Sequence, residues 1–313
     1  MNRVLVVDKP RGPTSHDVVE RLRRSTGIRK IGHAGTLDPT ATGVILALVG
    51  RATRIASFLM ELEKEYRGDL VLGTTTDTQD AAGNVLTRSD ASGVTREALE
   101  DAFERFSGEI EQVPPMVSAL KRGGKPLYEL ARKGIEVERE PRAVTIHRLA
   151  LLAYDPPRVE FDVVCSKGTY VRTLAADIGE SLGCGAHLGE LRRLRVGPFG
   201  VDRALPLAEL EKLGRGANEA GLSMFEALEG LPAVELDERE LDTISTGGAI
   251  TLEPERLAGS VEPHVRLARG DELVAVGKRA GSSGDDDPRI VVRPVRVFTE
   301  PFGGTGGGRR EDR

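Results

Sequence analysis

Cysteine and histidine are scarce in this chain, and their scarcity argues against several kinds of site. The 313 residues include two cysteines, Cys165 and Cys184, and five histidines. Two distant cysteines are too few for a disulfide framework or a cysteine-based zinc site. The histidines show none of the spacings typical of metal ligands. We therefore expect no metal site.

Long hydrophobic runs are missing as well. No stretch approaches the roughly 18 uninterrupted apolar residues that a membrane-spanning helix needs. The first ten residues, MNRVLVVDKP, lack the apolar core of a signal peptide. We expect a cytoplasmic protein that makes no membrane contact. With 39% hydrophobic and 30% charged residues, the chain is long enough for two domains.

The chain as a whole has no excess of positive charge, since its formal net charge is -5. The charges are nevertheless unevenly distributed. Residues 1–60 contain ten Lys or Arg against four Asp or Glu, whereas residues 199–313 contain fifteen against twenty-two. The basic N-terminal part can bind phosphates while the whole protein remains mildly acidic.

The segment 32–43 reads GHAGTLDPTATG and places one carboxylate, Asp38, between a glycine-rich turn and Pro39. Glycines leave little side-chain bulk to shield this carboxylate from a large substrate. Basic stretches at 21–30 and 51–54 flank the segment. This pattern indicates a nucleophile within a site for a polyanion. The alternative is an aspartate that forms an Asx turn before a proline.

Helices and strands alternate without the regular spacing of βαβ units. Capping residues and apolar periodicity predict helices over 15–26, with Ser15 as its cap, and over 95–107 and 173–182. A helical period also covers 52–62, and strands are expected over 66–72 and 159–165. These elements predict an α+β fold with a mixed, largely antiparallel sheet flanked by helices.

Composition divides the chain into parts. A first domain is expected over 1–230, and it contains a polar, basic segment at 118–141 in which Pro126 is placed to open a short helix. The chain then becomes acidic and rich in strands, which predicts a small β-rich domain over 231–300. The glycine-rich end, 301–313, is expected to be a disordered tail.

Several long motifs carry a resemblance to the TruB family of tRNA pseudouridine synthases. Besides the segment around Asp38, they are DKP at 8–10, KEYRGDLVLGTTTDTQDAAG at 64–83, VPPMVSALKRGGKPLYELAR at 113–132 and CSKGTYVRTLAADIGESLGCGAHLGELRR at 165–193. They span most of the first 200 residues in the family's order. The stretch ARGDELVAVG at 268–277 resembles, more weakly, an RNA-binding domain of the PUA type.

The resemblance implies a pseudouridine synthase fold and isomerisation of a T-loop uridine in tRNA, without metal or other cofactor. Asp38 matches the catalytic aspartate, which attacks the flipped nucleotide at the sugar or at the base. Tyr66 matches the tyrosine that packs against the flipped base, and Arg172 the arginine that pairs with the catalytic carboxylate. A neighbouring guanidinium favours the ionised carboxylate against the effect of burial.

Other residues fall on family positions that imply substrate contacts. Lys9 and Tyr170 are expected to line the cleft, and Leu191 to close on the uracil. His33 is expected to contact RNA, and Arg54, where many relatives carry lysine, a phosphate. The remaining substrate-binding positions are Asp80, Lys121 and Arg122, the last two in the segment 118–141, which resembles the family's RNA-gripping insertion.

Each of these positions has a structural alternative. Tyr66, Tyr170 and Leu191 are of residue types that also pack in cores. His33 can bond a turn and Asp80 can cap one, while the segment 118–141 can be a solvated surface loop.

Three functions compete at this point. The first is a stand-alone tRNA isomerase, expected to be a monomer with no obligatory protein partner. The second is an RNA chaperone that refolds tRNA through its basic surface. The third is a glycosidase, which would need a second acid paired with Asp38, and no such pair of carboxylates is apparent in the sequence.

Overall fold

The computed structural model describes residues 2–118, 120–122, 124–131, 134–257, 259–284 and 287–298. Contacts between Cα atoms divide the chain into two compact units. The larger comprises Leu5–Ala47 and Ser57–Ala217, and the smaller gathers Met1–Val4, Leu48–Ala56 and the chain from Asn218. This division starts the C-terminal unit earlier than the expected 231, and adds to it two short stretches from the first part of the chain. The predicted tail, 301–313, lies outside the described residues.

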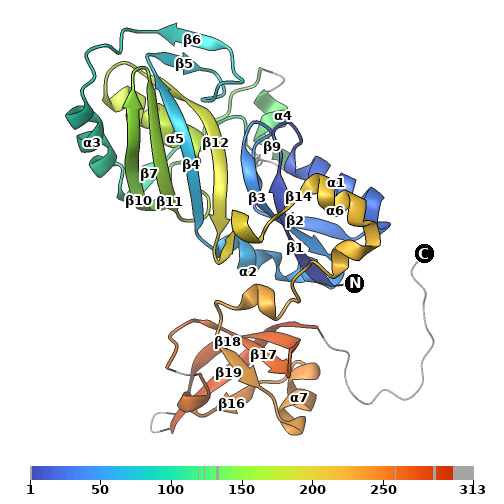
Figure 1. Ribbon diagram of the computed structural model, residues 1–313. Coiled ribbons are helices and arrows are strands. Elements are labelled where there is room, and N and C mark those ends of the chain that lie inside the picture. The colour runs from blue at the N-terminus through green and yellow to red at the C-terminus, as the bar shows by residue number, and fades with distance from the viewer. Residues whose placement is uncertain are drawn as a thin grey trace. The chain divides into compact units, whose positions relative to one another are not determined.

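A sheet of ten strands in the described residues forms the frame of the protein (Figure 1). Eight strands follow the order β14-β1-β3-β12-β4-β11-β10-β7, while β2 pairs with β3 and β13 with β12. Their bounds are β1 (Arg3–Lys9), β2 (Ile31–Ala34), β3 (Thr42–Val49), β4 (Lys64–Leu72), β7 (Gly108–Gln112), β10 (Arg142–Asp155), β11 (Arg158–Cys165), β12 (Ala186–Val196), β13 (Phe199–Gly200) and β14 (Leu205–Pro206). Two of the pairings, β1 with β14 and β3 with β12, are parallel, whereas β12, β4, β11, β10 and β7 pair antiparallel in turn. The predicted mixed, largely antiparallel α+β fold is confirmed.

Helices cover one face of the antiparallel part of the sheet. The larger unit contains α1 (Ser15–Thr26), α2 (Ala56–Glu61), α3 (Arg96–Arg105), α4 (Leu127–Ala131), α5 (Val171–Ser181), α6 (Leu207–Leu213), the 3-10 turns η2 (Val201–Arg203) and η3 (Gly214–Asn218), and the short strand pairs β5 (Thr74–Thr76) with β6 (Val85–Arg88) and β8 (Lys121–Arg122) with β9 (Lys125–Pro126). Leu99 and Phe103 of α3 share a core with Ile178 of α5 and Phe161 of β11. The helix expected at Pro126 begins one residue later, as α4.

The start of α1 differs from the prediction in a way that matters for the site. Thr14, not Ser15, caps the helix, because the Thr14 hydroxyl accepts from the backbone N–H of Asp17 and the Asp17 carboxylate accepts from that of Thr14. Ser15 is buried instead. Its hydroxyl donates to the Leu37 carbonyl at 3.0 Å and accepts from the Leu37 N–H at 2.8 Å. The first residue of α1 therefore holds the chain immediately before Asp38.

The smaller unit has its own sheet, in the order β15-β17-β18-β19-β16. These strands are β15 (Ala233–Glu235), β16 (Ile250–Leu252), β17 (His264–Arg269), β18 (Glu272–Gly284) and β19 (Asp287–Val297), with α7 (Glu238–Ser245) and the turns η1 (Gly50–Ile55), η4 (Glu226–Leu228) and η5 (Pro254–Leu257). Ile244 of α7 packs with Leu267 of β17 and Val292 of β19 in a separate core. Such a small β-rich unit is consistent with the expected PUA-like domain.

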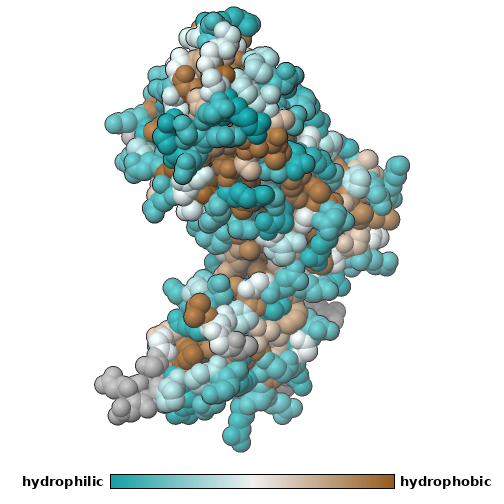
Figure 2. Space-filling model, turned by 60° about the vertical axis from the view of Figure 1, so that its left-hand side comes forward, coloured by the Kyte–Doolittle hydropathy of each residue, from teal (hydrophilic) through white to brown (hydrophobic). Residues whose placement is uncertain are grey.

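The described surface gives no indication of a membrane segment. None of the helices in the described ranges is long and apolar enough to cross a bilayer. On the face of the larger unit shown in Figure 2, hydrophobic residues appear in patches among hydrophilic ones. Single exposed apolar residues such as Leu86 and Val261 are ordinary for a protein surface.

One close approach in the sheet is possible only because residue 43 is glycine. Gly43 pairs with Arg193 across the parallel β3–β12 contact and has φ +103°. A Cβ atom at this position would lie 2.1 Å from the Arg193 carbonyl oxygen. Only glycine avoids both the strain and the overlap.

We predict that Gly43→Ala lowers the free energy of unfolding by more than about 3 kcal/mol, because backbone strain and a backbone clash add. Gly12→Ala is the matched control, since Gly12 has a similar φ of +110° but no atom within 4 Å of its would-be Cβ. Urea unfolding of both variants measures the difference. Equal losses would show that the close approach to Arg193 carries no cost.

Candidate active site

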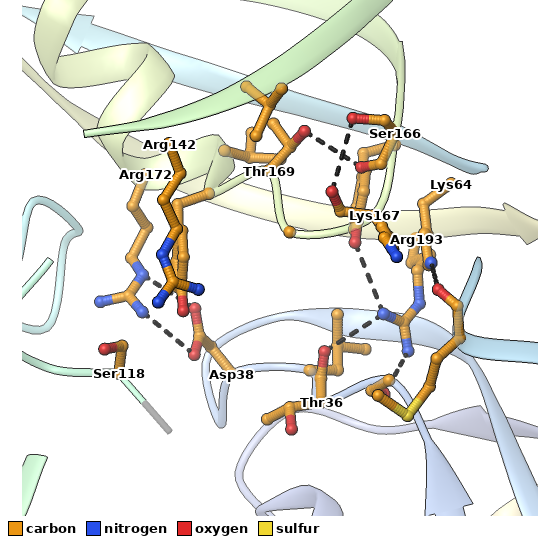
Figure 3. Close-up of a pocket in the computed structure, with 18 of the residues that line it drawn as sticks. Thr36, Asp38, Lys64, Ser118, Arg142, Ser166, Lys167, Thr169, Arg172 and Arg193 are labelled. Atoms are coloured by element: carbon orange, nitrogen blue, oxygen red, sulfur yellow. Dashed lines mark hydrogen bonds and ion pairs between the residues drawn. The ribbon is translucent and has the colours of Figure 1, made fainter. Parts of the chain in front are cut away.

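Asp38 and Arg172 form the centre of a cavity of about 590 Å³ in the larger unit. Asp38 lies in the loop between β2 and β3, and Arg172 is the second residue of α5. The Arg172 Nε lies 2.8 Å from Asp38 Oδ2, and Nη2 lies 3.3 Å from Oδ1 (Figure 3). The predicted helix 173–182 begins two residues earlier, at Val171, which places Arg172 in its first turn.

Backbone carbonyls hold the Arg172 guanidinium in place. Its Nη1 donates to the Thr78 carbonyl at 3.2 Å and its Nη2 to the Val117 carbonyl at 2.9 Å. The Arg172 side chain is only 5% exposed, whereas that of Asp38 is 36% exposed. The carboxylate is therefore the accessible member of the pair, and the guanidinium is its fixed support.

The charge state of Asp38 results from opposing effects. Burial raises the pKa of the Asp38 carboxyl above its ordinary value, and the Arg172 guanidinium acts against this rise. The negative charge of Asp80 raises the Asp38 pKa further, and the positive charge of Lys9 lowers it. Arg172 and Lys9 therefore both favour the ionised form that a nucleophile requires.

Asp80 supports the pair from outside the cavity. It is buried, and its Oδ1 accepts from the Thr78 hydroxyl at 2.6 Å and from the Ala82 N–H at 3.0 Å. These bonds shape the turn that presents the Thr78 carbonyl to Arg172. Asp80 thus combines the capping role that the sequence left open with an electrostatic effect on Asp38.

Tyr66, Tyr170 and Leu191 line the cavity together with Asp38. Tyr66 comes from β4, and its hydroxyl lies 3.4 Å from Nη1 of Arg193. Tyr170 precedes α5, where its backbone N–H donates to Gln112 Oε1 at 3.0 Å. Leu191 lies on β12. The structure thus brings five of the sequence-predicted residues into one place, counting Arg172.

Lys9 does not line this cavity, so its expected position requires correction. Its side chain is fully buried, and Nζ donates to the carbonyls of Pro10 at 3.0 Å, Pro13 at 2.9 Å and Pro39 at 3.4 Å. Burial lowers the pKa of Lys9 to about 8. The ammonium group needs these carbonyls because burying an unpaired cation is costly. Lys9 thus holds the residue that follows Asp38.

His33 and Arg54 are not among the residues that line the cavity. His33, on β2, has a buried Nδ1 with no hydrogen-bond partner among the described residues, and burial lowers its pKa. Arg54 belongs to the smaller unit, where its guanidinium carbon lies 5.1 Å from the centre of the Phe298 ring. The backbones of Lys121 and Arg122 form β8, but their side chains lie outside the described part of the structure.

Arg193 is a buried residue of the site that sequence reasoning missed. It is 1% exposed and bonds the Val44 carbonyl at 2.6 Å through Nε. Its Nη1 and Nη2 donate to the carbonyls of Thr36 and Gly35, each at 3.2 Å (Figure 3). Strand alternation puts Arg193 on the same face of β12 as Leu191, and this was the available signal. Arginine usually lies at the surface, so the residue type gave no indication that Arg193 would be buried.

The described residues contain no group of three or more His, Cys, Asp or Glu side chains arranged to hold a metal ion. Around Asp38 the lining offers a guanidinium, two tyrosine rings and the aliphatic side chain of Leu191. This set suits nucleophilic attack on a large planar substrate.

Two family models match adjoining parts of the chain. The N-terminal domain of the TruB family of pseudouridylate synthases matches residues 23–171, and the C-terminal domain of tRNA pseudouridylate synthase B matches 172–228. Two curated relatives are similar over nearly the whole chain, and both are named tRNA pseudouridine synthase B. The one from Azoarcus sp. (strain BH72) is 48% identical over 96% of this chain and 96% of its own. The one from Geobacter sulfurreducens is 44% identical over 95% of this chain and 100% of its own.

Solved structures also resemble this chain over nearly its whole length. A chain in a Cbf5–Nop10–Gar1 complex has a TM-score of 0.74 and 29% identity, covering 96% of this chain and 85% of that one. A chain in an H/ACA RNP bound to a substrate RNA containing 2′-deoxyuridine has a TM-score of 0.71 and 25% identity, covering 96% of this chain and 86% of that one. Fold and site together define a pseudouridine synthase, an isomerase. The chain belongs to the TruB family.

We predict that Ser15→Ala slows pseudouridine formation at least about tenfold and lowers the free energy of unfolding by about 2 kcal/mol, because the backbone of Leu37 loses both partners. Thr14→Ala is the control. It removes the cap of α1 at a cost of about 1 kcal/mol but leaves the loop of Asp38 held. Single-turnover rates and thermal unfolding measure the two effects. Similar rates in both variants would show that Ser15 does not position Asp38.

Proposed function

We propose that this protein converts a uridine in the T-loop of tRNA to pseudouridine, with Asp38 as the nucleophile. The observation that carries the proposal is the accessible Asp38 carboxylate, held by the buried Arg172 guanidinium in a cavity beside Tyr66 and Leu191. Membership of the TruB family supports tRNA as the substrate. So do the relatives named tRNA pseudouridine synthase B, which match over nearly their whole length.

The reaction rearranges the atoms of one nucleotide and needs no oxidant or reductant. Asp38 attacks the extruded nucleotide at the ribose C1′ or at the uracil ring, and the bond between C1′ and N1 breaks. The uracil rotates and C1′ bonds to C5 as Asp38 is released. The C5 proton then leaves to solvent and N1 takes up a proton, so the product is an isomer of uridine. Tyr66 offers a ring face to the base and Leu191 an apolar contact, which offset part of the few kcal/mol, roughly, that unstacking costs.

We further propose that the protein acts alone, as a monomer in the cytoplasm. The described residues that line the cavity all belong to one compact unit, the larger one. The structural neighbours described above are complexes of several components, as their titles state. Pseudouridine formation on transcribed tRNA by the purified protein alone tests this point. A requirement for a second protein would contradict it.

We predict that Asp38→Asn abolishes pseudouridine formation on a T-stem-loop transcript, because an amide oxygen is a poor nucleophile. Most of the RNA affinity should remain, since asparagine keeps the shape of the site. Asp90→Asn, which removes a carboxylate from an exposed loop, is the control and should retain full activity. Full activity of Asp38→Asn would refute the assignment. Persistence of tRNA refolding in the inactive variant would instead reveal an independent chaperone role.

Two variants should move the acid limb of the pH–rate profile in opposite directions. Arg172→Gln removes the charge that lowers the Asp38 pKa, so the rate should begin to rise at a higher pH than in the wild type. Asp80→Asn removes a charge that raises the Asp38 pKa and keeps the Oδ1 acceptor, so its acid limb should lie at a lower pH. Single-turnover rates across the acid range measure both. Shifts of the same sign would contradict ionised Asp38 as the reacting form.

A further inference from the structure

The cations around the cavity differ in how they are paired. Five cationic side chains, those of Lys64, Arg142, Lys167, Arg172 and Arg193, line the cavity, together with the carboxylates of Asp38 and Glu61. Arg172 is paired with Asp38, and Lys167 with Glu61. Arg193 and Lys64 donate to backbone carbonyls, in the case of Lys64 those of Met60 and Leu62. Among these five side chains, only the guanidinium of Arg142 makes no hydrogen bond or ion pair with the described residues.

The position of the Arg142 backbone is fixed, although its side chain has no partner among the described residues. It is the first residue of β10 and lies opposite Gln112 of β7 in the antiparallel register. Gln112 is buried, and its side-chain amide bonds both the backbone N–H and the carbonyl of Tyr170, at 3.0 and 3.3 Å. The backbone that carries Arg142 is therefore tied to the start of α5, from which Arg172 projects.

The guanidinium groups of Arg142 and Arg172 line the same cavity as the Asp38 carboxylate (Figure 3). Asp38 neutralises Arg172, so Arg142 leaves an uncompensated positive charge at an accessible wall of the cavity. A guanidinium presents parallel N–H donors that match the two oxygens of a phosphate. RNA brings one such anion with every nucleotide, and protein contacts to these phosphates set the position of the strand.

We propose that Arg142 binds a backbone phosphate next to the extruded uridine and so positions this nucleotide over Asp38. This inference rests on the proposed function, because it takes RNA as the substrate. Arg142 follows directly after the segment 118–141, which was expected to grip RNA, but belongs to the ten-stranded sheet. It therefore supplies a fixed phosphate contact beside the reacting group.

Arg142→Gln should raise the Kd for a T-stem-loop RNA about tenfold. The slope of log Kd against log salt should fall by about one, the value expected for the loss of one phosphate contact. Arg148→Gln is the matched control. Arg148 lies on the same strand, but its guanidinium is paired with Glu65 at 2.8 Å. Both variants remove one positive charge, so an effect of net charge alone would be equal in the two. Circular dichroism and thermal unfolding establish that both variants fold.

A neutral linkage in the RNA provides the decisive measurement. Methylphosphonate groups are placed one at a time at the linkages that flank the target uridine. At one of these linkages, the neutral group should lower the affinity of the wild-type enzyme about tenfold. The same group should hardly lower the affinity of Arg142→Gln, because this variant already lacks the guanidinium that contacts the phosphate. Arg142→Lys should restore part of the affinity, since it keeps the charge without the paired donors.

The outcomes separate this inference from the proposed function. If the wild-type protein forms no pseudouridine in the T-stem-loop, the proposed function fails. If the wild type is active but Arg142→Gln binds as tightly as Arg148→Gln, the inference about Arg142 is wrong. It is also wrong if every neutral linkage weakens the wild type and Arg142→Gln equally, or if Lys167→Gln, rather than Arg142→Gln, abolishes the effect of the linkage.

Discussion

The loop from Gly35 to Pro39 is fixed by buried polar side chains, and the chemistry of the site depends on this constraint. Arg193 bonds the carbonyls of Gly35 and Thr36, Ser15 bonds the backbone of Leu37, and Lys9 reaches the carbonyl of Pro39. Every residue of the loop except Asp38 is thereby held. A nucleophile that must meet an extruded nucleotide benefits from such preorganisation, because little conformational entropy is then lost in the reaction.

The same arrangement explains how a partly buried carboxylate can remain useful as an anion. Burial disfavours the charge on Asp38, and the guanidinium of Arg172 and the ammonium of Lys9 favour it. Arg172 does not depend on Asp38 for its own position, since it also donates to the carbonyls of Thr78 and Val117. The support would therefore remain in place if the carboxylate forms and breaks a covalent bond, as the proposed function requires. A pair that depended on each other alone would lose its geometry in such a step.

The sequence allowed the prediction of elements and motifs, but not of the contacts between them. Capping residues and apolar spacing predicted the bounds of α1, which ends before Gly27 in the left-handed conformation, because local interactions decide where helices end. The cap was wrong because Thr14 and Ser15 are both good caps, and only the tertiary contact of Ser15 with Leu37 distinguishes them. Arg193 was missed for a related reason, since its partners lie about 150 residues away in the sequence.

The segment expected to grip RNA contributes to the cavity, through Ser118 and Leu120, but is not part of the large sheet. Within the described residues of the segment 118–141, the regular elements are β8, β9 and α4, and β8 and β9 pair with each other rather than with the large sheet. The carbonyls that hold Arg172, those of Thr78 and Val117, lie outside this segment. Arg142 marks the boundary, because β10 joins the large sheet at this residue. In the proposed function, the segment 118–141 can thus adjust to the RNA while Asp38 and Arg172 keep their positions.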